Sequence, residues 1–247
     1  MLTCAAIIPG APVLVPAVAA GAAPELAGCR DAVDAVVHRL LADGPDVVAI
    51  VGSGERTIRH EPGARSSLAS VGVDSDATLG AGSDAGPVTD NQVGGVAPLP
   101  LSLSIGTWAL LRGAPQSPAV RGLEVATREA PQVCLGAGAG LVEGAVRVAL
   151  LVVADGTARR GPKAPGYTDA RADGFDALWL HAVRDADAGA LARLDPLLAD
   201  ELMMAGRAPL QVLAGAAHGS RWAAKLLYSD DPYGVQYAVA QWLPSAA

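Results

Sequence analysis

The run of apolar residues Val146–Ala154, interrupted only by Arg147, restricts the fold of this 247-residue chain more than any other segment. Such a run is typical of a strand that is buried on both faces of a sheet. Asp155-Gly156-Thr157 then ends the strand, and a basic loop that contains Arg159 and Arg160 follows. In an open α/β sheet, ligands bind outside the carboxyl ends of the strands. The sequence therefore predicts that a binding site lies at this loop.

Two earlier segments predict that the same sheet contains a βαβ unit. Thr3–Ile8 is typical of a buried strand, and Asp46–Val51 is typical of a second one that closes in the turn Gly52-Ser53-Gly54. Between them, Pro24–Asp43 places its apolar residues on one stripe, which predicts an amphipathic helix. Strand, helix and strand in this order predict a parallel pair with a right-handed crossover. We therefore expect an α/β protein, with residues 1–247 forming a single domain.

The remaining segments continue the mixture of helices and strands. Expected along the chain are a possible strand at 67–73, a helix at 101–111, short strands at 120–126 and 132–135, helices at 169–185, 188–200 and 207–217, a strand at 223–228 and a closing segment at 234–242. Residues 55–100 are rich in Gly, Ser, Asp and Pro, so we expect an irregular excursion over the sheet's carboxyl edge, either functional or merely connecting. Gly136–Gly140 imitates a dinucleotide-binding fingerprint, but too few residues remain for a crossover helix, so we interpret it as a turn.

Composition argues against several classes of protein. Hydrophobic residues make up 51% of the chain and aromatic residues only 4%, so the core must consist mainly of Ala, Val and Leu. A net charge of −7 argues against nucleic-acid binding. Three cysteines without CxxC spacing, Cys4, Cys29 and Cys134, argue for a reducing compartment and against a zinc cluster. Pro or Gly interrupts every apolar stretch of eighteen residues, so we expect no membrane span. The N-terminus lacks the basic region with which a signal peptide begins, so we expect a cytoplasmic protein.

The adjacent pair Arg159 and Arg160 is the most informative charged feature. Guanidinium groups stay protonated at any working pH and bind carboxylates or phosphates through two parallel hydrogen bonds. The pair therefore predicts an anion-binding site. Alternatively, both are solvated loop charges, or one of them pairs with Asp155.

The four histidines divide into two groups. His38 and His181 flank the apolar stripes of predicted helices, and we interpret both as structural. His60 lies in a polar loop and His218 at the end of a predicted helix, so either could line a pocket, although a cation at a helix C-terminus is favourable by itself. Pro62 follows His60 too closely for an HExxH helix. The sequence VGSGE around Ser53 is not the G-x-S-x-G elbow of serine hydrolases.

Four segments, taken together and in order, resemble one known family. They are AAIIPGAPVLVP, DVVAIVGSG, LLVVADGTARR and LLYSDDPYGVQYAVAQW. The chain resembles the class III extradiol ring-cleavage dioxygenases of the LigB-like superfamily, in particular the Ala-rich actinobacterial branch. The resemblance implies a three-layer α/β/α sandwich around a mostly parallel or mixed sheet, related to the phosphorylase/hydrolase-like group, with the site at the carboxyl ends of the strands. It also implies non-haem Fe(II) held by two histidines and a glutamate, a further histidine as acid–base, and opening of catechol rings with O₂.

The residues at the family's functional positions depart from this pattern. Gly10 stands where the first histidine ligand is expected, Ser53-Gly54 where the second is expected, and the turn that ends in Arg159 and Arg160 where the acid–base histidine is expected. No glutamate near the C-terminus matches the third ligand. An Fe(II) site of this kind needs imidazoles, and an arginine beside a cation disfavours the metal further. We therefore expect no metal ligands and no cofactor, unless His60 or His218 rebuilds a site.

Three functions remain open. The first is a LigB-like protein without the iron site that binds a small anionic or aromatic compound at Arg159 or Arg160. The second is an enzyme of the same superfamily with a rebuilt or metal-independent active site that uses Asp155, His218 or Tyr233. The third is a non-catalytic partner or structural subunit, in a possible homo-oligomer. The candidate pocket residues are Gly10, Ser53, Gly54, Asp155, Arg159, Arg160, His218 and Tyr233.

Overall fold

The computed structural model describes residues 1–74, 76–79, 98–113, 118–144 and 146–245. Its centre is a seven-stranded sheet in the order β3-β6-β2-β7-β1-β9-β8. Strands β6, β2, β7 and β1 are parallel to one another. At the two edges, β3 pairs antiparallel with β6, β9 with β1, and β8 with β9. The strands are β1 (Leu2–Ile8), β2 (Val47–Gly54), β3 (Ile58–His60), β6 (Ala119–Ala126), β7 (Val148–Val153), β8 (Trp222–Asp230) and β9 (Tyr237–Pro244). A separate two-stranded sheet pairs β4 (Arg65–Ser67) with β5 (Asp76–Thr78).

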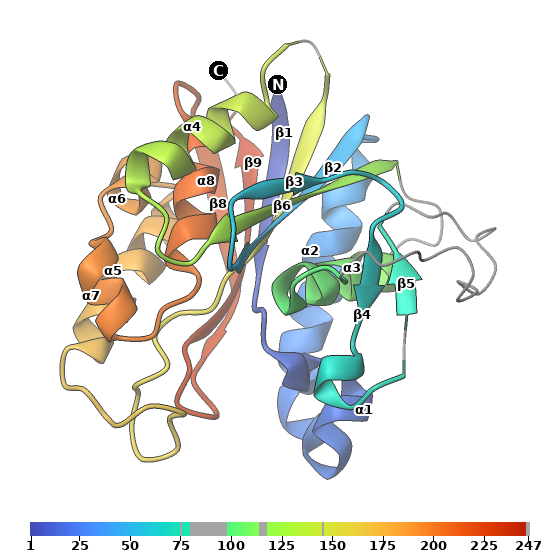
Figure 1. Ribbon diagram of the computed structural model, residues 1–247. Helices are drawn as coiled ribbons and strands as arrows, with labels where there is room; N and C mark the ends of the chain where they lie inside the picture. The colour runs from blue at the N-terminus through green and yellow to red at the C-terminus, as the bar shows by residue number, and fades with distance from the viewer. Residues whose placement is uncertain (75, 80–97, 114–117, 145, 246–247) are drawn as a thin grey trace.

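Helices cover both faces of the sheet (Figure 1). One face carries α2 (Ala27–Ala42) and α3 (Leu101–Gly113), together with the short α1 (Pro16–Ala19) and the 3-10 helices η1 (Pro12–Leu14), η2 (Ala20–Leu26) and η3 (Ala69–Val71). The other carries α4 (Pro131–Leu141), α5 (Ala172–Asp185), α6 (Ala188–Ala192), α7 (Pro196–Glu201) and α8 (Arg207–Ala217). This arrangement confirms the predicted three-layer α/β/α sandwich. Within the described ranges, no helix is long and apolar enough to cross a membrane.

The predicted central strand is confirmed, because β7 is the fourth of the seven strands and all its residues are buried. Successive side chains of a strand point to opposite faces of the sheet. Accordingly, Leu150 and Val152 belong to the apolar core beneath α4–α8, whereas Leu151 and Val153 belong to the core beneath α2 and α3. A strand that lies between two cores must be apolar on both faces, which explains the continuous run in the sequence.

The predicted βαβ unit needs one correction. β1 and β2 are parallel, as expected, but they are not neighbours, because β7 lies between them and pairs with both. The most continuously apolar strand thus takes the most buried place in the sheet. The antiparallel strands β9 and β8 extend the sheet beyond β1, at the edge opposite β6 and β3.

The predictions for residues 132–135 (strand) and Gly136–Gly140 (turn) are wrong, since both segments belong to the helix α4. Pro131 occupies its first turn, where proline is favoured. A Cβ atom on Gly138 would overlap the backbone carbonyl oxygen of Val212 in α8. The glycines therefore let the backbones of two helices touch. The crossover helix that we expected to be absent is present, but its glycines lie inside it and not at its N-terminus, so it lacks the phosphate-binding geometry.

The excursion at residues 55–100 is described only in part. The strand predicted at 67–73 is wrong, since Arg65–Ser67 forms β4 and Ala69–Val71 forms η3. The 3-10 helix ends at Gly72, whose φ of +80° suits a residue without a Cβ atom. Positions 75 and 80–97 of this excursion lie outside the described residues.

The contact between α4 and α8 can be tested with two glycine substitutions in α4, one of which is the control. Replacement of Gly138 by alanine is expected to lower the free energy of unfolding by about 2 kcal/mol, because the added methyl group overlaps backbone atoms of α8. The matched change Gly136→Ala adds a methyl group to the same helix with no atom within 4 Å, and should raise stability by up to ~1 kcal/mol. Urea unfolding of both variants measures the difference. Equal effects would contradict the backbone contact.

Candidate functional site

The carboxyl ends of the adjacent strands β1, β7 and β2 hold three of the residue groups that the sequence suggested. Gly10 follows β1, Asp155 follows β7, and Ser53 and Gly54 end β2. The backbone N–H of Gly10 donates a hydrogen bond to Oδ1 of Asp155 at 3.0 Å. The structure thus brings together two candidates that are 145 positions apart in the sequence.

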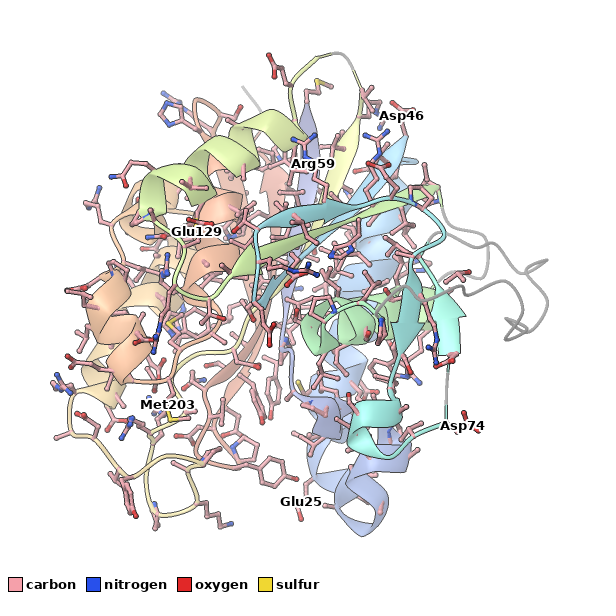
Figure 2. The ribbon with its side chains drawn as sticks, viewed as in Figure 1. Glu25, Asp46, Arg59, Asp74, Glu129 and Met203 are labelled. Atoms are coloured by element: carbon pink, nitrogen blue, oxygen red, sulfur yellow. The ribbon has the colours of Figure 1, made fainter. Side chains whose placement is uncertain are left out.

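A cavity of about 360 Å³ opens beside Asp155, and we call it the Asp155 pocket. The segment after β1, the loop after β7, the segment before α8 and the β8–β9 hairpin form its walls. The lining residues are Ala11, Pro12, Val13, Asp155, Gly156, Ala158, Pro165, Met203, Ala205, Tyr233, Val235 and Tyr237. The lining is therefore largely apolar and partly aromatic, and it contains one charged group. Met203 lies at the end of the molecule opposite Asp46, the residue directly before β2, so the pocket lies toward the carboxyl ends of the parallel strands (Figure 2).

That charged group, the Asp155 carboxyl, is enclosed by protein atoms except where it faces the pocket. Burial raises the pKa of Asp155 from 3.8 to about 7, and the hydrogen bond from Gly10 only partly opposes this rise. Two titratable groups lie near the carboxyl, the Cys29 thiol of α2 and the Tyr237 phenol of β9. Burial raises the pKa of Cys29 to about 12 and that of Tyr237 above its usual value, so both are neutral at pH 7. Within the described structure, no cation forms an ion pair with Asp155.

Arg160 is engaged by carboxylates of the protein and does not line the pocket. Its Nε donates to Oδ2 of Asp231 at 2.6 Å. Its Nη1 lies 3.2 Å from Oδ1 of Asp173 and 3.3 Å from Oδ2 of Asp176. Asp176 is fully buried and also accepts a hydrogen bond from the indole Nε1 of Trp179 at 2.7 Å. The guanidinium therefore ties the loop after β7 to α5 and to the hairpin, which leaves it poorly placed for an external anion.

Arg159 is also outside the pocket lining. Its Nη1 donates to the backbone carbonyl of Tyr167 at 3.3 Å. Its Nε is buried and has no hydrogen-bond partner among the residues that the structure describes. The adjacent arginines of the sequence thus do not form a two-pronged anion site at this pocket.

The structure separates the two remaining candidates. Tyr233 lines the Asp155 pocket, and its hydroxyl donates to Oε2 of Glu25 at 3.0 Å. Glu25 lies at the same end of the molecule as Met203 (Figure 2). His218 follows α8 and lines a different, larger cavity of about 550 Å³ between α4, α6 and α8. His218 is therefore not part of the Asp155 pocket.

A cluster of polar groups lies at the carboxyl ends of β2 and β6, and its members form hydrogen bonds with one another. The buried carboxylate of Glu124, in β6, occupies the space where a side chain on Gly54 would lie. Its Oε1 accepts from the backbone N–H groups of Glu55 and Arg56, at 2.9 and 3.0 Å. Its Oε2 lies 3.0 Å from Nε2 of His60. We did not anticipate Glu124 from the sequence, because it lies within an apolar strand.

Ser53 has only a backbone role in the described contacts. Its carbonyl oxygen accepts a hydrogen bond from the Ser102 hydroxyl of α3 at 2.6 Å. Ser102 also occupies the space beside Gly52, where a Cβ atom would meet its Oγ at 2.5 Å. This contact fixes the start of α3 against the end of β2.

The donor atoms at these strand ends do not fit the Fe(II) site of the family that the chain resembles. Gly10 offers no side-chain ligand, and the guanidinium of Arg160 has no lone pair to offer a metal ion. His60 is bound to Glu124, and His218 lies in the other cavity. Across the described ranges, no three His, Cys, Asp or Glu side chains are grouped so that they could hold a metal ion. A 2-His-1-carboxylate centre would need two imidazoles that these positions do not supply.

Several lining residues were missed in the sequence. Pro12 and Val13 could have been included, because they lie only two and three positions after Gly10, beyond the end of β1. Met203 and Tyr237 come from segments whose approach to β7 depends on tertiary packing, so nothing in their local sequence indicates a pocket. Asp155 and Tyr233 are the two candidates from the sequence that line this cavity; the first follows a strand and the second lies in the loop of the closing hairpin.

Comparison with known proteins gives evidence on the fold. No known protein family matches the sequence, and no curated protein is significantly similar to it. A crystal structure of the uncharacterized protein JW3007 from Escherichia coli K12 is similar over 98% of this chain and 99% of that chain, with a TM-score of 0.51 and 11% sequence identity. At this identity the likeness shows the fold alone. It supports the three-layer α/β architecture described above.

Proposed function

We propose that this chain is a LigB-like protein that binds a small, partly aromatic molecule in the Asp155 pocket without an iron centre. The observation that carries the proposal is the 360 Å³ cavity at the carboxyl ends of the strands, with Asp155 as its one charged lining group. The resemblance in sequence implies a site at the same end of the sheet. Cavities of about 300–1,000 Å³ with mostly apolar walls and a few polar groups are typical small-molecule sites.

The aromatic preference follows from the walls. Tyr233 and Tyr237 supply two rings, while Pro12, Pro165 and Met203 supply apolar contact area. Burial of apolar ligand surface is worth about 25 cal/mol per Å². A compound with one ring therefore gains several kcal/mol from leaving water, and the Asp155 carboxyl orients its polar group.

One observation favours a second candidate, a metal-independent enzyme that uses Asp155 as an acid–base. With a pKa of about 7, the carboxyl is about half protonated at neutral pH. Such a pKa suits a group that must both accept and donate a proton. Tyr233 and Tyr237, which line the same cavity, are the other side chains there with a polar group, whereas His218 is excluded by its position.

Binding in the pocket can be tested by thermal shift with benzyl alcohol, an uncharged one-ring probe. At ten times its Kd, the probe should raise the Tm by about 3–6 °C, because it binds the native state alone. Val13→Trp, which fills the pocket from the half-buried η1, should abolish the shift. Val133→Trp places the same side chain on the exposed surface of α4 and should leave the shift unchanged. No shift in the wild type would contradict the pocket and favour the structural-subunit hypothesis.

The absence of an iron centre is tested separately. Protein purified anaerobically is expected to contain far less than stoichiometric Fe(II) and to leave catechol intact in the presence of O₂. Metal analysis and oxygen uptake measure both quantities. Stoichiometric iron, with catechol consumption that a chelator stops, would overturn this part of the proposal.

A further inference from the structure

Resting on the proposed function, we infer that the ligand of the Asp155 pocket is an organic amine, whose ammonium group pairs with the Asp155 carboxylate and whose apolar body lies against Tyr233 and Tyr237. The sequence suggested an anion at this end of the sheet. The positions of the charged groups favour a cation.

The Asp155 carboxylate has an incomplete set of hydrogen bonds. Oδ1 accepts one hydrogen bond, from the backbone N–H of Gly10, and Oδ2 has no hydrogen-bond partner among the described residues. Asp155 is half-buried, and a carboxylate with reduced access to water is stabilised by a cation that pairs and hydrogen-bonds with it. An ammonium group carries three N–H donors and one positive charge, so it supplies both requirements.

The charged groups at this end of the sheet also favour a cation. The three carboxylates around Arg160 more than neutralise its single positive charge. Glu25 adds a carboxylate beside the pocket through its hydrogen bond with Tyr233. Arg159 and Lys163 belong to the loop after β7 and, like these carboxylates, do not line the pocket. Asp155 is the one charged group of the lining, so the cavity itself favours a cation over an anion.

The aromatic lining of the pocket suits a cation as well. The faces of aromatic rings attract cations because the ring carries negative charge on its faces. Two tyrosines line the cavity that contains the carboxylate, and Met203 and the two prolines complete an apolar surface. This combination suits a cation with an apolar body better than a bare inorganic ion or a highly polar molecule.

Binding of an amine should depend on pH, because the ammonium needs the ionised carboxylate. The pKa of Asp155 is about 7 in the free protein, so affinity should fall as the pH drops below 7, by about tenfold for each pH unit. The other titratable groups nearby are Cys29 from α2, Tyr237 from β9, and Tyr233 with its partner Glu25. Cys29 and both tyrosines have raised pKa values and stay neutral between pH 5.5 and 8.

Three probes with the same ring but different charge test this inference on the full chain. They are benzylamine, benzyl alcohol and benzoate, measured by calorimetric titration at pH 8 and pH 5.5. We expect benzylamine to bind at least ten times more tightly than benzyl alcohol at pH 8, and benzoate to bind most weakly. At pH 5.5 the affinity for benzylamine should fall by about 30-fold, whereas that for benzyl alcohol should change little.

Asp155→Asn should remove the preference for benzylamine while benzyl alcohol still binds, because asparagine keeps the shape and loses the charge. Glu143→Gln, an equal change of charge at an exposed position near the opposite ends of the strands, should preserve the preference. The inference is overturned if benzylamine binds no more tightly than benzyl alcohol, or if its advantage survives in Asp155→Asn. If benzyl alcohol and the other probes all fail to bind, the proposed function itself fails.

Discussion

Replacement of Asp155 by asparagine should stabilise the protein at pH 8 by up to about 4 kcal/mol and leave its stability at pH 4 almost unchanged. Folding raises the pKa of this carboxyl from 3.8 to about 7. A rise of this size corresponds to about 4 kcal/mol, at about 1.4 kcal/mol for each pH unit. Asparagine can still accept the hydrogen bond from Gly10, and it never ionises.

The direction of this change of stability with pH follows from proton binding. Between pH 3.8 and about 7, the folded protein holds a proton on Asp155 that the unfolded chain has released. Its contribution to stability therefore declines as the pH rises through this window and is constant above it. Urea unfolding from pH 4 to pH 8 measures the decline in the wild type, and it should be smaller in Asp155→Asn. Glu143→Gln should follow the wild type. Equal stability of wild type and Asp155→Asn at pH 8 would show that the carboxylate is compensated within the protein.

Replacement of Arg160 by methionine should lower the free energy of unfolding by about 3–5 kcal/mol. The change leaves the fully buried Asp176 without its guanidinium partner, and removal of one member of a buried ion pair strands the other charge. Thr157 and Trp179 would still donate hydrogen bonds to Asp176, but neither supplies a positive charge.

Chemical unfolding at pH 7 compares this variant with Arg184→Met, which removes an arginine from the exposed surface of α5. The control should change stability by less than ~0.5 kcal/mol. The double variant Arg160→Met with Asp176→Asn should recover part of the loss, because no buried charge is then left alone. A loss in Arg160→Met no larger than in the control would show that the cluster contributes little to folding.

Much of the fold could be predicted from the sequence because local patterns reported burial directly. The run at Val148–Val153 requires two apolar neighbours, one on each face, and it became the central strand. Apolar residues at helical spacing predicted α2 and α8 well, and the bounds of α8 match the expected range. The segment Gly136–Gly140 could not be interpreted correctly, because its glycines are explained by α8, which is distant in the sequence.

In the candidate site, too, some features could be predicted from the sequence and others could not. Asp155 could be found from the sequence because a residue directly after a buried parallel strand lies at the carboxyl edge of the sheet. The role of Arg160 could not be found, because two adjacent arginines look the same whether their partners are external anions or internal carboxylates. Asp231 and Asp176, which decide the matter, lie 71 and 16 positions away in the chain.

The tie between the loop after β7 and the closing hairpin has a consequence for recognition. Besides the Arg160 ion pairs, backbone hydrogen bonds join Gly156 to Gln236 and Arg160 to Gly234, at 2.7 and 3.1 Å. The carboxyl group and the tyrosines of the pocket are therefore held at a fixed separation before any molecule enters. Such a preorganised receptor loses little conformational entropy on association, and it should discriminate among ligands by the spacing between their charge and their ring.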